Sequence, residues 1–181
     1  VLAPYKLENF VFEKKVSYRI KSNWKVYLDN FLEGLHIPIV HPKLNDVMNY
    51  RSYNTKLYKN FSVQSGNLDD SKSPYAQSSN NVAYYFTIYP NILFNIAPGR
   101  FQTNIIEPLD EKECVVHFDY FFDSVCEKEI LRDINFSDEI QKEDILICEE
   151  VQKNLSSIGF EKGIISDKYE IGVKHFQDYI R

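Results

Sequence analysis

The sequence predicts an α+β protein in which an antiparallel sheet is followed by a long helix. Strand-like runs rich in aromatic and β-branched residues follow one another at 82–89, 92–96, 101–107 and 114–123. Short turns containing Pro-Asn, Pro-Gly or a charged cluster separate these runs. Beyond residue 137 the apolar residues instead recur at helical spacing. Because strands joined by short turns pair with their neighbours, we expect the sheet to be antiparallel.

The first part of the chain predicts strands before and after one helix. Residues 5–20 alternate loosely between apolar and polar side chains, which predicts one or two strands. From Trp24 the apolar residues follow a helical period, so we expect an amphipathic helix over residues 24–35. Asn23 is its expected N-cap, and Pro38 is expected to end it.

Residues 42–65 predict one or two further strands with polar neighbours facing outward. The Ser-, Asn- and Asp-rich residues 67–81 show no apolar period, and they predict a loop that could cover a site.

The last third of the chain predicts a long helix that begins near Ser137. Its expected buried stripe consists of Ile140, Ile147, Cys148, Val151, Leu155 and Ile158. Asp144 points to the same side as this stripe when each residue advances by about 100°. Burying an unpaired carboxylate is costly, so a charge at this position needs a partner.

Length and charge exclude several classes of protein. The 181 residues suffice for one domain, and residues 1–181 are expected to form a single one. The net charge of −5 and the scattered basic residues argue against a nucleic-acid partner. Three cysteines at unrelated spacings argue against a disulfide framework and favour the cytoplasm. We find neither a signal peptide nor an apolar run long enough for a membrane span.

A cluster of possible metal ligands lies between residues 29 and 41, where His36 and His41 are accompanied by two acids. Two imidazoles and one carboxylate form the facial ligand set of non-haem Fe(II) oxygenases, which leaves positions open for dioxygen and substrate. Asp144 could supply the carboxylate from the distant helix, and this role would explain its buried position. Glu33 precedes His36 by three residues and could accept the second ring N–H of that histidine. Ordinary surface histidines, a solvated Glu33 and a solvent-facing Asp144 are the simpler alternatives.

Two separated motifs resemble those of the Rieske non-haem iron oxygenases, which include the large subunits of aromatic-ring-hydroxylating dioxygenases and related monooxygenases. The first comprises Asn23-Trp24-Lys25, Asp29-Asn30, Glu33, His36 and His41. The second comprises residues 143–152, Gly163, Ser166, residues 170–173 and His175-Phe176. Both motifs occur in the order found in the family and together span most of the chain.

The resemblance implies that His36, His41 and Asp144 bind a mononuclear Fe(II). It also implies that Glu33 is the acid that bridges this iron to a Rieske cluster on a neighbouring subunit. Asn30, with Asp29 beside it, is expected in the surroundings of the iron ligands. The implied fold is the helix grip, a curved antiparallel sheet around a long C-terminal helix with the substrate between them.

Family members also carry a Rieske domain whose Cys-x-His and Cys-x-x-His pairs bind a [2Fe–2S] cluster. Cys114-Val115-Val116-His117 has one such spacing but lies in a strand pattern without a second pair. We therefore expect the Rieske domain to precede this chain and to be absent from it, so that the chain alone cannot sustain turnover. Electrons from NAD(P)H would arrive through a reductase or ferredoxin, and the full-length protein is expected to be a homo-oligomer, such as a trimer.

The expected activity is oxygenation with O2, which would hydroxylate an aromatic ring or oxidatively demethylate a quaternary amine. The sequence leaves the substrate open, as well as the choice between a monooxygenase and a dioxygenase. The aromatic residues expected to line the pocket are Tyr84, Phe86, Phe94 and Phe101, with Tyr85 and Tyr89 as further candidates. Two alternatives remain, namely a metal-free helix-grip module that binds apolar ligands and a zinc hydrolase.

Overall fold

The computed structural model describes residues 3–69, 81–123 and 126–181 of the chain. Most of the expected covering loop at 67–81 lies outside the described residues. The described strands are β1 (Val11–Ile20), β2 (Met48–Tyr58), β3 (Phe61–Leu68), β4 (Val82–Ile88), β5 (Ile92–Ala97), β6 (Arg100–Pro108) and β7 (Cys114–Phe122). They form one antiparallel sheet in the order β1-β7-β6-β5-β4-β3-β2.

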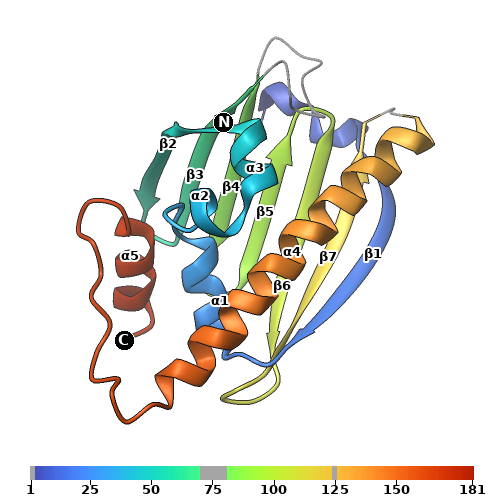
Figure 1. Ribbon diagram of the computed structural model, residues 1–181. Coiled ribbons are helices and arrows are strands. Elements are labelled where there is room, and N and C mark those ends of the chain that lie inside the picture. Colours follow the sequence, from blue (N-terminus) through green and yellow to red (C-terminus); the bar gives the residue numbers. More distant parts are fainter. Residues whose placement is uncertain (1–2, 70–80, 124–125) are drawn as a thin grey trace.

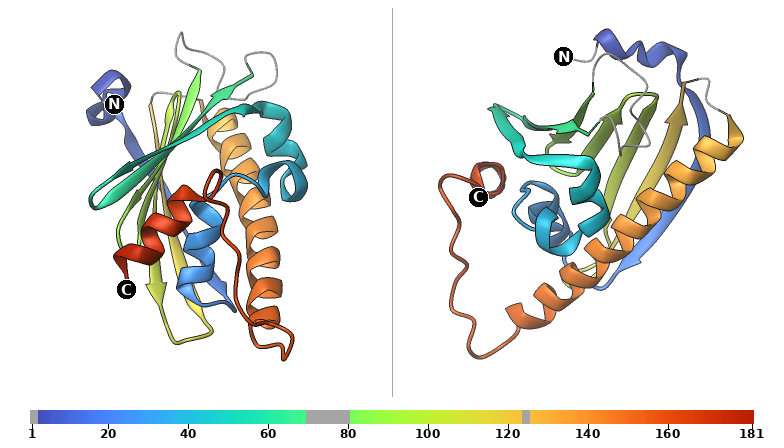
Figure 2. Two further views of the ribbon diagram at one scale, coloured as in Figure 1. Left: turned by 90° about the vertical axis from the view of Figure 1, so that its left-hand side faces the viewer. Right: turned by 45° about the horizontal axis from the view of Figure 1, so that its top comes forward.

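The helices of the described chain are α1 (Trp24–Phe31), α2 (Ile37–Val40), α3 (Pro42–Val47), α4 (Glu127–Leu155) and α5 (Ile171–Tyr179), after two short 3-10 turns at Ala3–Tyr5 and Leu7–Asn9. The long helix α4 runs diagonally across one face of the curved sheet (Figure 1). Helices α1 and α3 lie on this same side of the sheet (Figure 2). This arrangement confirms the predicted α+β helix-grip fold.

The main core lies between the inner face of the sheet and helices α1 and α4. Alternate residues of β7 point inward, so that Val116, Phe118 and Tyr120 are at most 3% exposed. They pack with Leu28 of α1 and Cys148 of α4. The alternation follows from the two-residue period of a strand, which places every second side chain on the same face.

Helix α1 begins as predicted but ends earlier than expected. The side chain of Asn23 accepts a hydrogen bond from the Lys25 N–H at 2.9 Å, which confirms the N-cap. The helix ends at Phe31, and Pro38 lies in the first turn of α2. Proline is well tolerated there because first-turn N–H groups need no partner within the helix. The prediction that Pro38 ends the preceding helix is therefore wrong.

Two further boundaries differ from the prediction. Residues 42–47 form α3, although a strand was expected from residue 42. Helix α4 begins at Glu127, and Ser137 is a buried residue within it. A Glu129 carboxylate oxygen accepts a hydrogen bond from the Cys126 N–H at 3.4 Å, which supports this earlier start.

The predicted buried stripe of α4 is only partly buried. Cys148 is 1% exposed, whereas Val151 and Leu155 are 39% and 37% exposed, and Ile158, beyond the helix, is fully exposed. The last turns of α4 therefore extend past the core, where helical spacing alone does not ensure burial.

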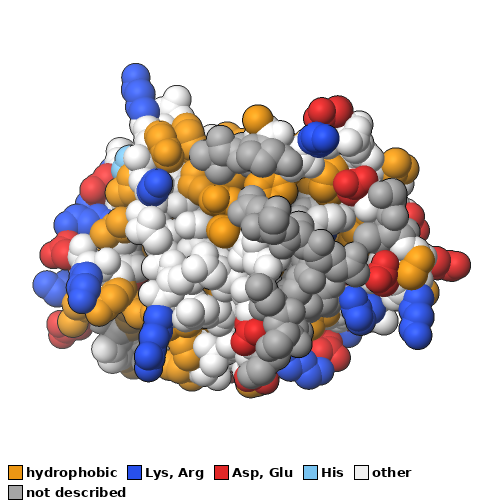
Figure 3. Space-filling view, turned by 90° about the horizontal axis from the view of Figure 1, so that it is seen from above, with side chains coloured by type: hydrophobic (Ala, Val, Ile, Leu, Met, Phe, Trp, Pro, Cys, Tyr) orange, Lys and Arg blue, Asp and Glu red, His pale blue; other side chains and the backbone are white. Residues whose placement is uncertain are grey.

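No helix in the described ranges has both the length and the apolar character needed to cross a membrane. On the face of the molecule in Figure 3, basic and acidic side chains are interspersed around the rim. Interspersed charges do not provide the continuous basic surface that nucleic-acid phosphates require.

Candidate metal centre

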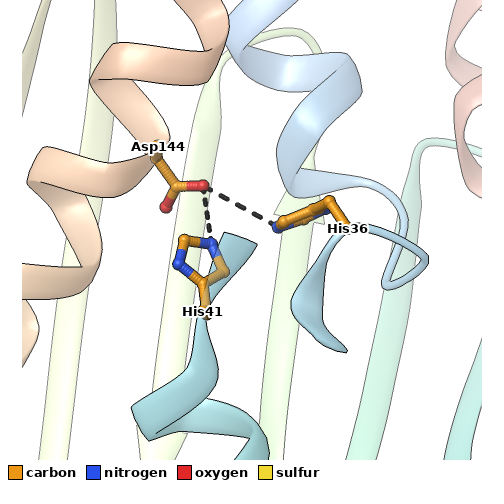
Figure 4. A group of neighbouring side chains, drawn as sticks. All are labelled: His36, His41 and Asp144. Atoms are coloured by element: carbon orange, nitrogen blue, oxygen red, sulfur yellow. Dashed lines mark hydrogen bonds and ion pairs between the residues drawn. The ribbon is translucent and has the colours of Figure 1, made fainter. Parts of the chain in front are cut away.

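Three predicted ligands from distant parts of the chain converge beside α4. His36 immediately precedes α2, His41 lies between α2 and α3, and Asp144 projects from α4 (Figure 4). Oδ1 of Asp144 lies 3.0 Å from Nε2 of His41 and 3.7 Å from Nε2 of His36. One possible ligand atom from each residue lies within 4.8 Å of the other two.

The short helix α2 explains how two histidines five residues apart reach the same point. It occupies the residues between them, so the chain turns once and brings both rings to one side. The rings are nearly perpendicular, with centroids 5.0 Å apart. The His41 side chain is 1% exposed, so its position is fixed by packing.

Each histidine contacts a second carboxylate through its other ring nitrogen. Nδ1 of His36 is hydrogen-bonded to Glu33, whose carboxylate also accepts the His36 backbone N–H at 3.3 Å. Nδ1 of His41 lies 2.7 Å from Oε2 of Glu143. A carboxylate that holds Nδ1–H leaves Nε2 as the unprotonated nitrogen, which is the form that binds a metal. Both Nε2 atoms face Asp144.

Glu143 is a site residue that the sequence analysis did not assign. The available signal was its position next to Asp144 in the sequence. Neighbouring residues on a helix point about 100° apart, so adjacency alone does not predict that both reach the same histidine. The contact depends on His41 lying between the two carboxylates.

The surroundings of His41 also affect its protonation. Burial disfavours the charged imidazolium, but the hydrogen bonds and negative charges of Asp144 and Glu143 outweigh this effect and raise the pKa of His41. The site therefore attracts positive charge between its carboxylates. Either a proton or a divalent metal ion would supply this positive charge.

The two residues expected around the ligands have different positions. Nδ2 of Asn30 donates a hydrogen bond of 2.6 Å to Oδ1 of Asp144, so Asn30 contacts a predicted ligand. Asp29 instead contacts α5, where its Oδ2 accepts a hydrogen bond from Gln177 at 2.9 Å. Consecutive helical residues point in different directions, so Asn30 and Asp29 have different partners, and a role for Asp29 around the ligands stays a prediction.

A cavity adjoins the three ligands, between the inner face of the sheet and the helices. Its aromatic wall comprises Tyr27, Phe31, Tyr53, Tyr85, Phe118 and Phe136. Its polar wall includes Asn95, Arg100, Asn104, Ser137 and Gln141. A mostly apolar cavity with a few polar groups is the usual form of a small-molecule site.

The four aromatic residues predicted to line this cavity do not do so. Tyr84 and Phe94 pack on the outer face of the sheet, against Tyr5 and Phe101 respectively. Phe86 is in the same outer cluster. Tyr85 is the strand neighbour that points into the cavity. The prediction failed because successive strand residues face opposite sides, and the sequence did not show which side was the inner one.

The donor set suits a non-haem iron ion. Two imidazole nitrogens and one carboxylate oxygen are the ligands of facial-triad Fe(II) sites. Hydrogen-bonded carboxylates behind both imidazoles match the support that metal-binding histidines usually have.

Residues 7–181 match the ring hydroxylating alpha subunit (catalytic domain) family. The chain belongs to this family. A choline monooxygenase of Arabidopsis thaliana, described as chloroplastic, is 34% identical over 152 residues, which make up 81% of this chain and 36% of that protein. A carnitine monooxygenase oxygenase subunit of Acinetobacter pittii is 28% identical over 176 residues, or 88% of this chain and 47% of that protein.

Among solved structures, this ring hydroxylating alpha subunit domain resembles a quaternary ammonium Rieske monooxygenase described in connection with carnitine oxidation by gut microbiota. The TM-score is 0.87 at 21% identity, and the match covers 96% of this chain and 50% of that one. This similarity confirms the fold. The chain spans less than half the length of the two curated relatives above.

Proposed function

We propose that the chain is the catalytic domain of a Rieske-type non-haem iron oxygenase that oxidises a small quaternary ammonium compound. The observation that carries this proposal is the convergence of His36, His41 and Asp144 in the wall of a cavity. These residues would hold mononuclear Fe(II), which supplies the activation of O2 when bound.

The residues around the ligands have distinct roles in this proposal. Glu33 and Glu143 orient the two imidazoles through Nδ1. Asn30 holds the Asp144 carboxylate through its 2.6 Å hydrogen bond. Glu33 also fits the bridging acid that would lead from His36 to a [2Fe–2S] cluster elsewhere in the whole protein. Its electrons would come from NAD(P)H through a reductase or ferredoxin, and a homo-oligomer would bring cluster and iron together.

The aromatic wall fits a quaternary ammonium group as the substrate. The rings of Phe31 and Tyr85 meet edge to face with centroids 6.2 Å apart. The Tyr53 hydroxyl donates a 3.5 Å hydrogen bond to the Glu33 carbonyl, which places a third ring near the ligands. Aromatic faces attract desolvated cations, and Glu33 adds a carboxylate to the same cavity. The named choline and carnitine relatives support the same class of substrate.

Anaerobic Fe(II) loading of the chain tests the iron site. We expect about one iron per wild-type chain and a raised melting temperature, because an ion that binds only the folded state stabilises it. Asp144→Ala should lose both effects. Glu150→Ala is the matched control, since Glu150 is an exposed acid on the same helix, paired with Lys153.

The same measurement separates the alternatives. Iron content in Asp144→Ala equal to that of the wild type would contradict the proposed ligand set. A metal-free binding module predicts no iron in either protein. Preferential zinc binding together with oxygen-independent turnover would indicate a hydrolase.

A further inference from the structure

We infer that the cavity selects an ammonium compound with an uncharged hydroxyl group over one with a carboxylate, and that Gln141 and Asn95 recognise this hydroxyl. This inference rests on the proposed function and specifies its substrate class. It follows from the hydrogen-bonding capacity of the cavity wall and from the charges beside it.

Gln141 presents a fixed hydrogen-bond donor close to the predicted ligands. The residue is 2% exposed, and its Oε1 accepts a 2.8 Å hydrogen bond from the Tyr27 hydroxyl. Among the described residues its buried Nε2 has no hydrogen-bond partner. Gln141 precedes Asp144 by three residues, so both lie on one side of α4, and both line the cavity.

Asn95 presents an acceptor to the same cavity from the sheet. It pairs with Tyr85 across β4 and β5, so its side chain lies beside that cavity-lining ring. Its Oδ1 is buried, and within the described chain it has no hydrogen-bond partner. A buried polar atom without a partner costs about 1–3 kcal/mol, which a complementary ligand group would recover.

One donor and one acceptor together fit a hydroxyl. A hydroxyl group both donates and accepts, so it can satisfy Gln141 Nε2 and Asn95 Oδ1. An ionised carboxylate only accepts. It would satisfy Gln141 and place its oxygen atoms against the Asn95 oxygen.

The charges of the wall also disfavour a carboxylate. Besides the two histidines, Arg100 is the basic side chain among the described residues that line the cavity. Its Nη1 donates to Asp133 at 3.0 Å, and its Nη2 donates to Gln102 at 2.7 Å. Asp133 therefore balances the charge of Arg100. The Glu33 carboxylate would repel a ligand carboxylate in the same cavity.

Three ligands of similar size test this inference by isothermal titration calorimetry on the full chain, both metal-free and loaded anaerobically with Fe(II). Choline carries the hydroxyl, glycine betaine replaces it with a carboxylate, and propyltrimethylammonium replaces it with a methyl group. We expect choline to bind about 10-fold or more tightly than either of the others, because a single hydrogen bond is worth roughly that factor.

Gln141→Met and Asn95→Leu keep side-chain volume and remove the polar atoms. Each should weaken choline binding about 10-fold and leave propyltrimethylammonium binding unchanged, which also shows that the cavity is intact. Thr87→Val is the matched control. The buried hydroxyl of Thr87 also has no hydrogen-bond partner within the described chain, but Thr87 is not among the residues that line the cavity.

The inference would be overturned if glycine betaine bound as tightly as choline. It would also be overturned if both variants bound choline with wild-type affinity, or if the wild type did not bind choline at all. None of these results bears on the iron content of the wild type. Failure of iron binding would contradict the proposed function instead, so the two failures are distinguishable.

Discussion

At the scale of single residues, the site depends on pairs of groups that orient each other. Glu33 and Glu143 hold the outer nitrogens of the two histidines, and Asp144 faces the inner ones. Asn30 restricts Asp144 in turn. The predicted ligand atoms therefore meet in a preorganised arrangement, which would reduce the cost of assembling them around a metal ion.

Removing Glu143 should weaken metal binding. Glu143→Ala frees Nδ1 of His41, and we expect Fe(II) affinity to fall about 10-fold or more, as for other carboxylates that support metal-binding histidines. Glu143→Gln keeps an acceptor oxygen without the charge and should retain an intermediate affinity. Competition titration under anaerobic conditions measures both constants. Equal affinity in the wild type and Glu143→Ala would show that this carboxylate does not support the ligand.

Asp29 should make stability depend on pH. Burial raises the pKa of Asp29 to about 6, above the value of about 3.9 for an unfolded chain. The folded state therefore holds this proton more tightly, so the free energy of unfolding falls as the pH rises from about 4 to 6 and stays lower above that. Asp29→Asn removes the buried charge and should raise the unfolding free energy at pH 8 by about 1–2 kcal/mol.

Urea unfolding at several pH values measures this effect. The gain from Asp29→Asn should shrink as the pH falls below about 6. Asp178→Asn is the control, because Asp178 is 59% exposed. A gain of the same size at pH 4.5 and pH 8 would contradict the assigned pKa.

At the scale of secondary structure, the position of the site depends on how short helices meet. Helix α2 sets the two histidines at its two ends, and α4 carries Asp144 across the sheet. Helix α5 packs against the C-terminal end of α1 at Leu32, the residue that precedes Glu33. A Cβ atom added to Gly172 of α5 would lie 2.6 Å from the carbonyl oxygen of Leu32.

Gly172→Ala should therefore destabilise the fold. The contact would be with backbone, so α5 must shift, and we expect a loss of about 1–3 kcal/mol in the free energy of unfolding. Gly163→Ala is the matched control, because an added Cβ there meets nothing within 4 Å. Chemical denaturation measures both variants. If they lose equal stability, close packing of α5 on α1 is not the cause.

At the scale of the whole molecule, a single long helix crosses one face of a curved sheet (Figure 1), and residues of both line the cavity. The predicted ligands come from the connection between α1 and β2 and from the middle of α4. Metal binding would therefore link the two layers of the domain. The same architecture in the quaternary ammonium monooxygenase, with a TM-score of 0.87, shows that it persists at 21% identity.

The sequence alone determined the order of the elements from β4 to α4, because period-two and helical spacing are local properties. It also indicated the three candidate ligands, because His36, His41 and Asp144 are set in recognisable motifs. Asp144 stood out further as a charge on an apolar stripe.

Only the tertiary structure decided which side of each element faces the cavity. Strand alternation allowed either Tyr84 or Tyr85 to point inward, and packing against the helices selected Tyr85. The same holds for Glu143, whose role requires His41 to arrive from a segment 102 residues away. Such contacts join residues distant in sequence, and no local pattern of side chains encodes them.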